Sequence, residues 1–249
     1  MSIGDRFRTA LAAVSEPGMS GAELLPVRLA RAAARMLPVD GAGLSLALPS
    51  GERIPLGGSS EDASLAERLQ FTVGGGPCMA SQDSGEPVFA MLQDLHRRWP
   101  PLADQLVSRT PYRAVAALPL SQGVAGRGAM DLYFRDQRAV STVDVFEAMA
   151  VGELITSALS EAAVWSTWAP ERGPDWLHGP AAAGRMAVWE AMGKVSLALD
   201  VEASAALDLM RAAAWAGDRT VDDVAADLLT ARMSPEALRG RGRPDPPRL

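Results

Sequence analysis

The sequence contains one cysteine and no long apolar run. Because Cys78 is the only thiol among 249 residues, an internal disulfide is excluded and a reducing compartment is expected. No apolar run approaches the length that spans a membrane. The charges scattered through residues 1–18 are untypical of a secretory signal. These features predict a soluble, cytoplasmic protein with no membrane partner.

Residues that commonly carry metal or catalytic chemistry are also scarce. His96 and His178 are the only histidines, and neither stands near acids or thiols at the spacing of metal ligands. No nucleophile, base or pair of carboxylates in a glycine-framed pocket suggests a catalytic constellation. The sequence therefore predicts no metal site, no cofactor and no enzymatic activity.

Positive charge is limited as well. The 24 basic residues include a single lysine, Lys194, and are outnumbered by 30 acidic residues, which gives a net charge of -6. Because nonspecific binding to nucleic acid depends mainly on neutralising phosphates, this balance argues against a nonspecific nucleic-acid binder.

The length of 249 residues and the hydrophobic content of 48% are sufficient for two domains with packed cores.

Helical and strand-like patterns alternate between residues 21 and 163. Helical spacing occurs at 24–36, 64–70, 102–107 and 143–163, and strand-like patterns occur at 42–48, 53–56, 88–92, 114–120 and 128–134. In the predicted helix 143–163, one apolar side is expected to contain Phe146, Met149, Ala150 and Leu154. Short turns between neighbouring strands favour an antiparallel sheet flanked by helices, and hence an α+β domain. Residues 1–20, interrupted by Glu16-Pro17-Gly18, are predicted to be a flexible arm.

A glycine run, Gly74-Gly75-Gly76, precedes Pro77 and Cys78. A phosphate-binding loop would require a following Gly-Lys-Ser/Thr and a helix, and neither is indicated, so a structural turn is the favoured interpretation. For Cys78 a redox sensor and a cofactor tether are both conceivable. With no basic residue nearby in sequence to activate it, a buried apolar role is favoured.

Prolines and glycines at 170, 173, 174, 179 and 180 predict a linker over 164–180. Three short helical patterns follow, at about 185–199, about 203–216 and from Thr220 onwards, and predict an all-α three-helix bundle over 181–236. Gly217 is expected to end the second helix in the left-handed conformation, and Thr220 to cap the third. The Arg- and Pro-rich segment 237–249 is predicted to be disordered.

Arg211 and Trp215 lie one turn apart on the polar face of the second of these helices. An exposed indole beside a guanidinium could stack on an unpaired base. Alternatively, Trp215 packs against another part of the protein or a second subunit, with Arg211 over its ring. The sequence leaves these two interpretations open.

The terminal segment resembles the ANTAR domain, the helical output domain of transcription antitermination regulators. The residues that carry the resemblance are Arg185, Val188, Glu190, Ala191, Met192 and Gly193, then 206–215, then 218–221 with Val224 and Ala225. The sequence differs from the usual pattern at Lys194, which stands where an apolar residue is usual, and at Asp200, which stands where glycine is common.

Residues 24–160 resemble the GAF sensory domain that precedes ANTAR in actinobacteria. The matching motifs are Gly76-Pro77-Cys78, Gly85-Glu86-Pro87-Val88, Asp94-Leu95 with Arg98-Trp99-Pro100, Leu118-Pro119-Leu120 and 128–133. The motif at Gly74-Gly75-Gly76-Pro77-Cys78 lacks the acidic residue that is usual in the family.

The two resemblances imply a homodimeric regulator in which a GAF-like domain senses a signal and paired ANTAR-like bundles bind a dual-hairpin RNA. The predicted RNA-binding residues are Arg185, Lys194, Arg211, Trp215 and Arg219. The GAF-like domain is a candidate site for a small-molecule ligand. The alternative is a signalling or dimerisation module whose bundle binds a protein, which the five basic and nine acidic residues between Arg185 and Glu236 favour.

Overall fold

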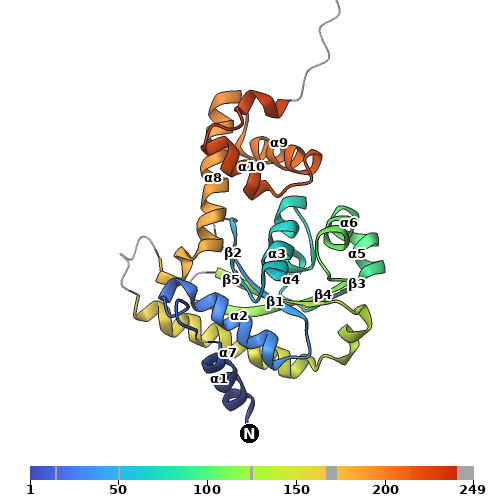
Figure 1. Cartoon of the computed structure of the whole chain (residues 1–249), viewed down its shortest axis with the longest axis vertical. Coiled ribbons are helices and arrows are strands. Elements are labelled where there is room, and N and C mark those ends of the chain that lie inside the picture. The colour runs from blue at the N-terminus through green and yellow to red at the C-terminus, as the bar shows by residue number, and fades with distance from the viewer. Residues whose placement is uncertain (15, 50, 124–125, 167–172, 240–249) are drawn as a thin grey trace, which may run out of the picture. The chain divides into compact units, whose positions relative to one another are not determined.

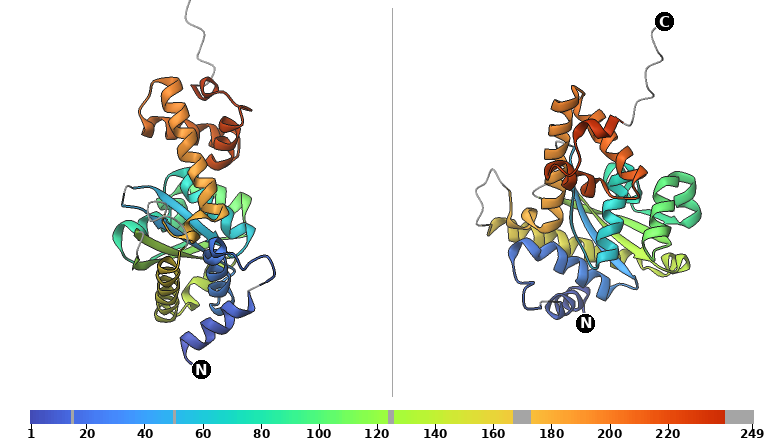
Figure 2. Two further views of the ribbon diagram at one scale, coloured as in Figure 1. Left: turned by 90° about the vertical axis from the view of Figure 1, so that its left-hand side faces the viewer. Right: turned by 45° about the horizontal axis from the view of Figure 1, so that its top comes forward.

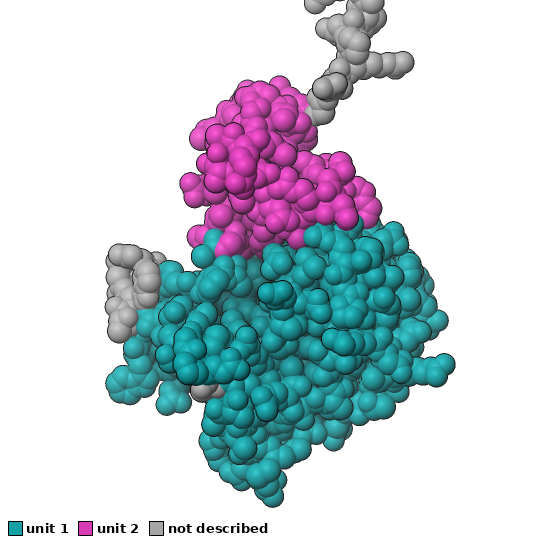
Figure 3. Space-filling model, viewed as in Figure 1, with its two compact units in different colours: residues 1–183 teal, residues 184–249 magenta. Residues whose placement is uncertain are grey.

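The computed structural model describes residues 1–14, 16–49, 51–123, 126–166 and 173–239 (Figure 1). The chain divides into two compact units, residues 1–183 and residues 184–249, which are coloured separately in Figure 3. Within the described ranges, no helix is both long enough and apolar enough to cross a membrane.

Unit 1 (residues 1–183) is built around a sheet. Among the described residues, five strands form it, in the order β2-β1-β5-β4-β3 with every neighbouring pair antiparallel. Their bounds are β1 Gly41–Ala47, β2 Arg53–Gly58, β3 Val88–Met91, β4 Ala114–Gly123 and β5 Gly126–Phe134. The predicted α+β domain with an antiparallel sheet is therefore confirmed.

Helices cover both faces of this sheet (Figures 1 and 2). One face is covered by α2 Leu25–Met36 and α7 Val145–Val164, and α1 Ile3–Ala13 packs against these two helices. The other face is covered by α3 Glu61–Val73, α4 Pro77–Ser84, α5 Leu92–Arg98 and α6 Pro100–Arg109. Short 3₁₀ helices lie at η1 Ala22–Leu24, η2 Gln137–Thr142 and η4 Asp175–His178. Because strand side chains alternate between the faces, each strand contributes to two different layers.

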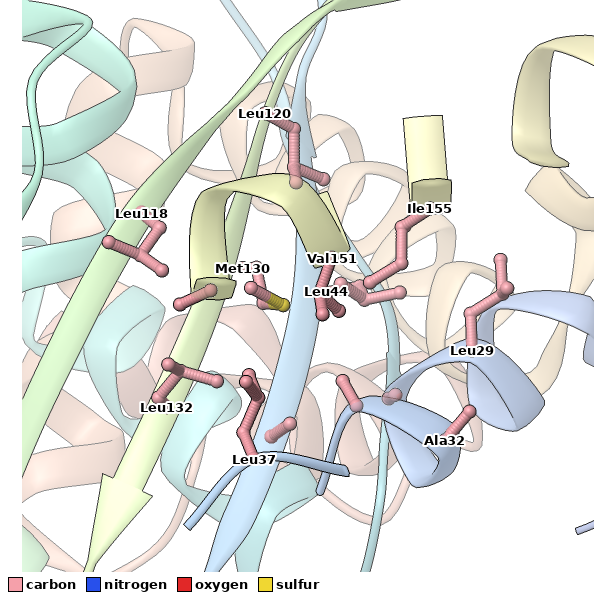
Figure 4. Close-up of a cluster of buried hydrophobic side chains, with 14 of the residues drawn as sticks. Leu29, Ala32, Leu37, Leu44, Leu118, Leu120, Met130, Leu132, Val151 and Ile155 are labelled. Atoms are coloured by element: carbon pink, nitrogen blue, oxygen red, sulfur yellow. The ribbon is translucent and has the colours of Figure 1, made fainter. Parts of the chain in front are cut away.

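The layer beneath α2 and α7 is apolar. Leu44 of β1, Leu118 of β4 and Met130 of β5 meet Leu29 of α2 and Val151 of α7 there (Figure 4). The opposite layer contains a smaller apolar cluster, including Leu69, Leu102 and Leu106, and also a group of buried polar side chains that is described below. The two faces of the sheet therefore differ in chemistry.

The predicted flexible arm at 1–20 is wrong for residues 3–13, which form α1. Ser2 and Asp5 make a capping box at its start, and the side chains of Phe7 and Val14 are buried in the apolar layer of unit 1. Arg6 forms an ion pair with Glu147 of α7. Local capping and the burial of one aromatic ring thus order a segment whose composition resembles a linker.

The predicted apolar side of α7 is only partly directed at the core: Met149 and Leu154 pack against it, whereas Phe146 does not. Phe146 is 88% exposed, and the buried side of the helix consists of Ala148, Val151, Gly152, Ile155 and Leu159. The helix is apolar on more than one side, so spacing alone does not identify the side that faces the sheet.

Two helices missing from the sequence interpretation, α4 and α5, flank the glycine run and the Arg98-Trp99-Pro100 motif. Gly74 ends α3 in the left-handed conformation, and Pro77 begins α4 at its first turn, where a missing amide hydrogen costs nothing. The expectation that Pro77 and Cys78 open no helix is therefore wrong.

The predicted linker at 164–180 is partly ordered. Trp176 of η4 is buried, and its indole Nε1 donates a hydrogen bond to the Leu159 carbonyl of α7 at 2.9 Å. Residues 167–172 of the predicted linker lie outside the described residues. A large buried side chain therefore anchors the ordered part to α7.

Unit 2 (residues 184–249) consists of short helices. They are the C-terminal part of α8 Pro180–Leu199, then α9 Ala203–Ala216, α10 Val221–Leu229 and the 3₁₀ helix η5 Pro235–Arg239. Thr220 caps α10 through a capping box with Asp223, as predicted. Residues 237–239 belong to η5, with Leu238 buried, so they depart from the predicted disordered tail; residues 240–249 lie outside the described residues.

Left-handed backbone in unit 2 occurs at residues other than glycine. Gly217 has φ −99°, so its predicted left-handed role is wrong, and Asp218 takes that role with φ 50°. Asp200, at the end of α8, has φ 53°, and Ala231, after α10, has φ 57°. This conformation crowds a Cβ atom and favours glycine.

Glycine at position 231 should therefore stabilise the protein. We expect Ala231→Gly to raise the free energy of unfolding by about 1 kcal/mol, because it relieves left-handed strain at the end of α10. The matched control is Ala226→Gly, on the exposed side of the same helix, which should lower stability by about 1 kcal/mol. Thermal unfolding of both variants measures the difference, and two shifts of the same sign would contradict the prediction.

Candidate functional sites

Five buried side chains of unit 1 form a polar cluster between the sheet and α3–α4: Glu67, Gln70, Cys78, Asp131 and Tyr133. None is more than 6% exposed. Burial of a charged carboxyl is costly unless partners compensate it, so the contacts of these residues indicate what the cluster can do.

The positions of these side chains follow from local structure. Asp131 and Tyr133 alternate with Met130 and Leu132 on β5, which directs the polar pair to the face opposite the apolar layer. Glu67 and Gln70 are three residues apart on α3 and so share one side of that helix. Cys78 lies in the first turn of α4, directly after the glycine run.

Hydrogen bonds join the cluster. Tyr133 donates from its hydroxyl to Glu67 Oε1 at 2.7 Å, and Gln70 Nε2 donates to Asp131 Oδ2 at 2.6 Å. The backbone amide of Cys78 donates to Gln70 Oε1 at 3.0 Å, so Gln70 connects the thiol-bearing turn to the sheet. Tyr133 is also fixed by stacking on Tyr112, with ring centroids 4.9 Å apart.

Small residues make room for the carboxylates. Across the sheet, Asp131 pairs with Gly43 of β1 on one side and with Ala117 of β4 on the other. A Cβ atom at Gly43 would lie 2.1 Å from Glu67 Oε1, and one at Gly76 would lie 2.3 Å from Gln70 Oε1. Gly76 is therefore required by a side chain of the cluster, which gives the glycine run its structural role.

The electrostatics of the cluster favour protonated forms. Burial raises the pKa of Asp131 to about 6, although hydrogen bonds from its neighbours oppose the shift. Burial, together with the nearby Asp131 and Glu67 carboxylates, raises the pKa of the Cys78 thiol well above its ordinary value. Without a compensating cation, this thiol is therefore a poor nucleophile.

A second set of polar side chains links the cluster to the surface. Ser45 Oγ lies 2.9 Å from Cys78 Sγ and accepts a hydrogen bond from Gln82 Nε2 at 3.1 Å. Arg53, a partly exposed residue of β2, donates to Gln82 Oε1 and forms an ion pair with Asp83 at 2.7 Å.

The sequence interpretation missed this cluster. No carboxylate pair was predicted from the sequence, whereas Glu67, Asp131 and Cys78 bring their ligand atoms within 4.8 Å of one another. Cys78 is buried, as expected, but its surroundings are polar rather than apolar. The available signal was Asp131, a carboxylate in the middle of an apolar strand pattern.

The second candidate site is the predicted RNA-binding set in unit 2, where the basic side chains have protein partners. The Arg185 side chain is 1% exposed, and its Nε lies 3.4 Å from Asp222 Oδ1 of α10. Arg185 is therefore part of the packing of α8 on α10, and its predicted phosphate contact is not supported by its burial.

Lys194 and Arg219 both support α10. Lys194 Nζ donates to the Leu228 carbonyl at 2.6 Å, which places its charge at the negative end of the helix dipole. Arg219 lies 2.7 Å from Asp227 Oδ2 and donates to the Asp223 carbonyl at 2.9 Å. Contact of either residue with RNA would have to compete with these interactions.

Arg211 and Trp215 lie on the exposed side of α9, opposite its buried residues Ala206, Met210 and Ala214. Trp215 is 48% exposed. Arg211 is half-buried and lies 3.6 Å from Asp208 one turn earlier, and burial lowers the pKa of its guanidinium. The structure thus brings these two predicted site residues together on one helix face.

Comparison of the sequence with protein-family models and with curated proteins gives no match.

Proposed function

We propose that this protein is a signal-responsive RNA-binding regulator of transcription antitermination. In this proposal unit 1 is a GAF-like sensory domain and unit 2 is an ANTAR-like domain. The support for unit 1 is the antiparallel sheet with helices on both faces, together with the motifs at 76–78 and 128–133. The support for unit 2 is the ordered string of matching residues across α8, α9 and α10.

The observation that carries the RNA-binding part is the exposure of Trp215. A large aromatic ring that is half exposed on a helix, one turn from a guanidinium, provides a flat surface on which an unpaired base can stack. Hairpin loops offer such bases. Because Arg211 is the only basic residue of α9, stacking rather than phosphate neutralisation would supply most of the specific affinity.

Dimerisation would give the selectivity for paired hairpins. One α9 face offers a single stacking surface, whereas a homodimer offers two, and joining two weak contacts multiplies their affinity. A signal bound by unit 1 would act by favouring one arrangement of the two bundles of the dimer relative to each other, because a ligand shifts only those states that it binds differently.

The test is binding of the purified full chain to a labelled dual-hairpin RNA, with salt and protein concentration varied. We expect Trp215→Ala to weaken binding about 5- to 150-fold, the equivalent of losing roughly 1–3 kcal/mol of stacking per base. Arg211→Ala should weaken it in the same direction. The matched control is Leu197→Ala, which removes an apolar side chain that is 86% exposed on α8 and should leave binding unchanged.

One further control makes the test decisive. A single-hairpin RNA should bind more weakly than the dual-hairpin RNA to the dimer, because only one contact can form. If Trp215→Ala and Arg211→Ala both bind as tightly as the wild type, the site assignment is wrong.

The second candidate function is a signalling or dimerisation module whose unit 2 binds a protein. The observation in its favour is that Arg185, Lys194 and Arg219 already have partners within a bundle that is rich in acidic residues. Weak binding to RNA in every condition, by a chain that is folded and dimeric, would favour this candidate over the first.

A further inference from the structure

We propose that unit 1 binds a divalent cation of the zinc class, held by the Cys78 thiolate and by the carboxylates of Glu67 and Asp131. This site is separate from the α9 face, and the proposal is independent of RNA binding.

The spacing of the three groups fits a metal ion. Their ligand atoms all lie within 4.8 Å of one another. Donors bound to zinc at about 2.0–2.3 Å lie about 3.3–3.8 Å apart in tetrahedral geometry, so a contraction of about an ångström completes the site.

One oxygen of Asp131 receives no hydrogen bond of normal geometry from the described residues. Its Oδ2 accepts hydrogen bonds from Gln70 and Tyr133, at 2.6 and 3.3 Å. Its Oδ1 is buried, and in the part of the chain that the structure describes no hydrogen bond of normal geometry reaches it. Buried polar atoms without partners are rare and costly, and a cation bound at Oδ1 would remove this cost.

The charge of the cluster also favours a bound divalent cation. Two carboxylates and a thiol place three acidic groups in one enclosed cluster. A divalent cation compensates that charge and stabilises the thiolate outright. The Cys78 proton is then released to solvent as the sulfur–metal bond forms.

The donor types select the metal. A thiolate disfavours magnesium and calcium, which prefer oxygen ligands, whereas zinc accepts sulfur and carboxylate oxygen together. Three protein ligands leave a fourth position for water or a small molecule, as in zinc sites that exchange a ligand. Gln70 and Tyr133 would orient the carboxylates from outside the coordination sphere, through the hydrogen bonds already described.

The experiment is a titration of the chelator-treated full chain with Co²⁺, used as an optical substitute for Zn²⁺. We expect a thiolate-to-cobalt charge-transfer absorption that saturates at about one metal per chain and disappears when Zn²⁺ is added. Because Cys78 is the only cysteine, this absorption in the wild type identifies the ligand without any variant. Its absence, with no shift of the thermal unfolding midpoint by Zn²⁺, would overturn the proposal.

Variants test the remaining ligands. Asp131→Asn keeps the size and one oxygen of the side chain, and should weaken Co²⁺ binding at least tenfold, since even the loss of an outer partner costs about 10–100-fold. Ser45→Ala is the matched control, because Ser45 contacts the Cys78 sulfur without belonging to the ligand set, and it should retain the absorption. Binding of Co²⁺ to a folded Asp131→Asn variant with wild-type affinity would overturn the role of this carboxylate.

Discussion

Replacement of Trp176 by alanine should destabilise unit 1 by about 3–5 kcal/mol, the range observed when a large buried aromatic residue is truncated. Trp176 is only 4% exposed in η4, packs into the apolar layer beside α7, and donates its indole hydrogen to the Leu159 carbonyl. The substitution leaves a cavity and deprives that carbonyl of a partner. A loss of this size is a large fraction of the stability of an ordinary domain.

Urea unfolding followed by circular dichroism measures this effect, and the chain supplies a matched control. Trp165 is 77% exposed at the end of α7, so Trp165→Ala should change stability by no more than about 0.5 kcal/mol. Trp176→Phe should fall between the two variants, since it keeps most of the apolar surface and loses only the hydrogen bond. Equal effects of the two alanine variants would show that η4 does not anchor the segment after α7.

The second large effect is expected at Gly43, where an alanine would collide with the polar cluster. Its Cβ atom would lie 2.1 Å from Glu67 Oε1 and 2.8 Å from Glu67 Cγ. Glu67 is buried and held by Tyr133, so it cannot move without losing that hydrogen bond. We expect Gly43→Ala to cost about 2–5 kcal/mol, from overpacking together with the lost charged hydrogen bond.

A double-mutant cycle separates this collision from a general effect of alanine in β1. In a Glu67→Ala background the obstructing side chain is absent, and Gly43→Ala should then cost much less than it does in the wild type. A coupling energy of about 1–3 kcal/mol is expected for two residues in contact. Additive losses in denaturant unfolding would show that Gly43 and Glu67 do not compete for the same space.

The strands and helices with a regular apolar spacing were predictable from local sequence patterns. The strands at 42–48, 114–120 and 128–134 were found because apolar runs bounded by turn residues depend on nearest neighbours alone. The helix at 203–216 has the same bounds in the structure, since a narrow apolar stripe and a following glycine define both ends. By contrast, α1 and η4 depend on Phe7 and Trp176 reaching a distant core, which no local window records.

The candidate sites likewise combine features that local sequence patterns predict with features that depend on distant contacts. Arg211 and Trp215 were predicted to share a helix face, and a period of 3.6 residues is sufficient for that inference. The polar cluster unites residues from α3, α4 and β5 that are up to 66 positions apart, and only the sheet register brings them together. The roles of Arg185 and Lys194 likewise depend on α10, a partner that lies more than 30 residues away in sequence.

The alternation along β5 also constrains how unit 1 can fold. A slip of one residue between β5 and β1 would move Asp131 into the layer of Leu44 and Leu118, and would place Met130 beside Glu67. Both exchanges are unfavourable, because one buries a carboxylate among aliphatic side chains and the other removes the partner of Gln70. The shifted register is therefore unfavourable on both faces of the sheet. The polar cluster thus also fixes the register in which β5 pairs with β1.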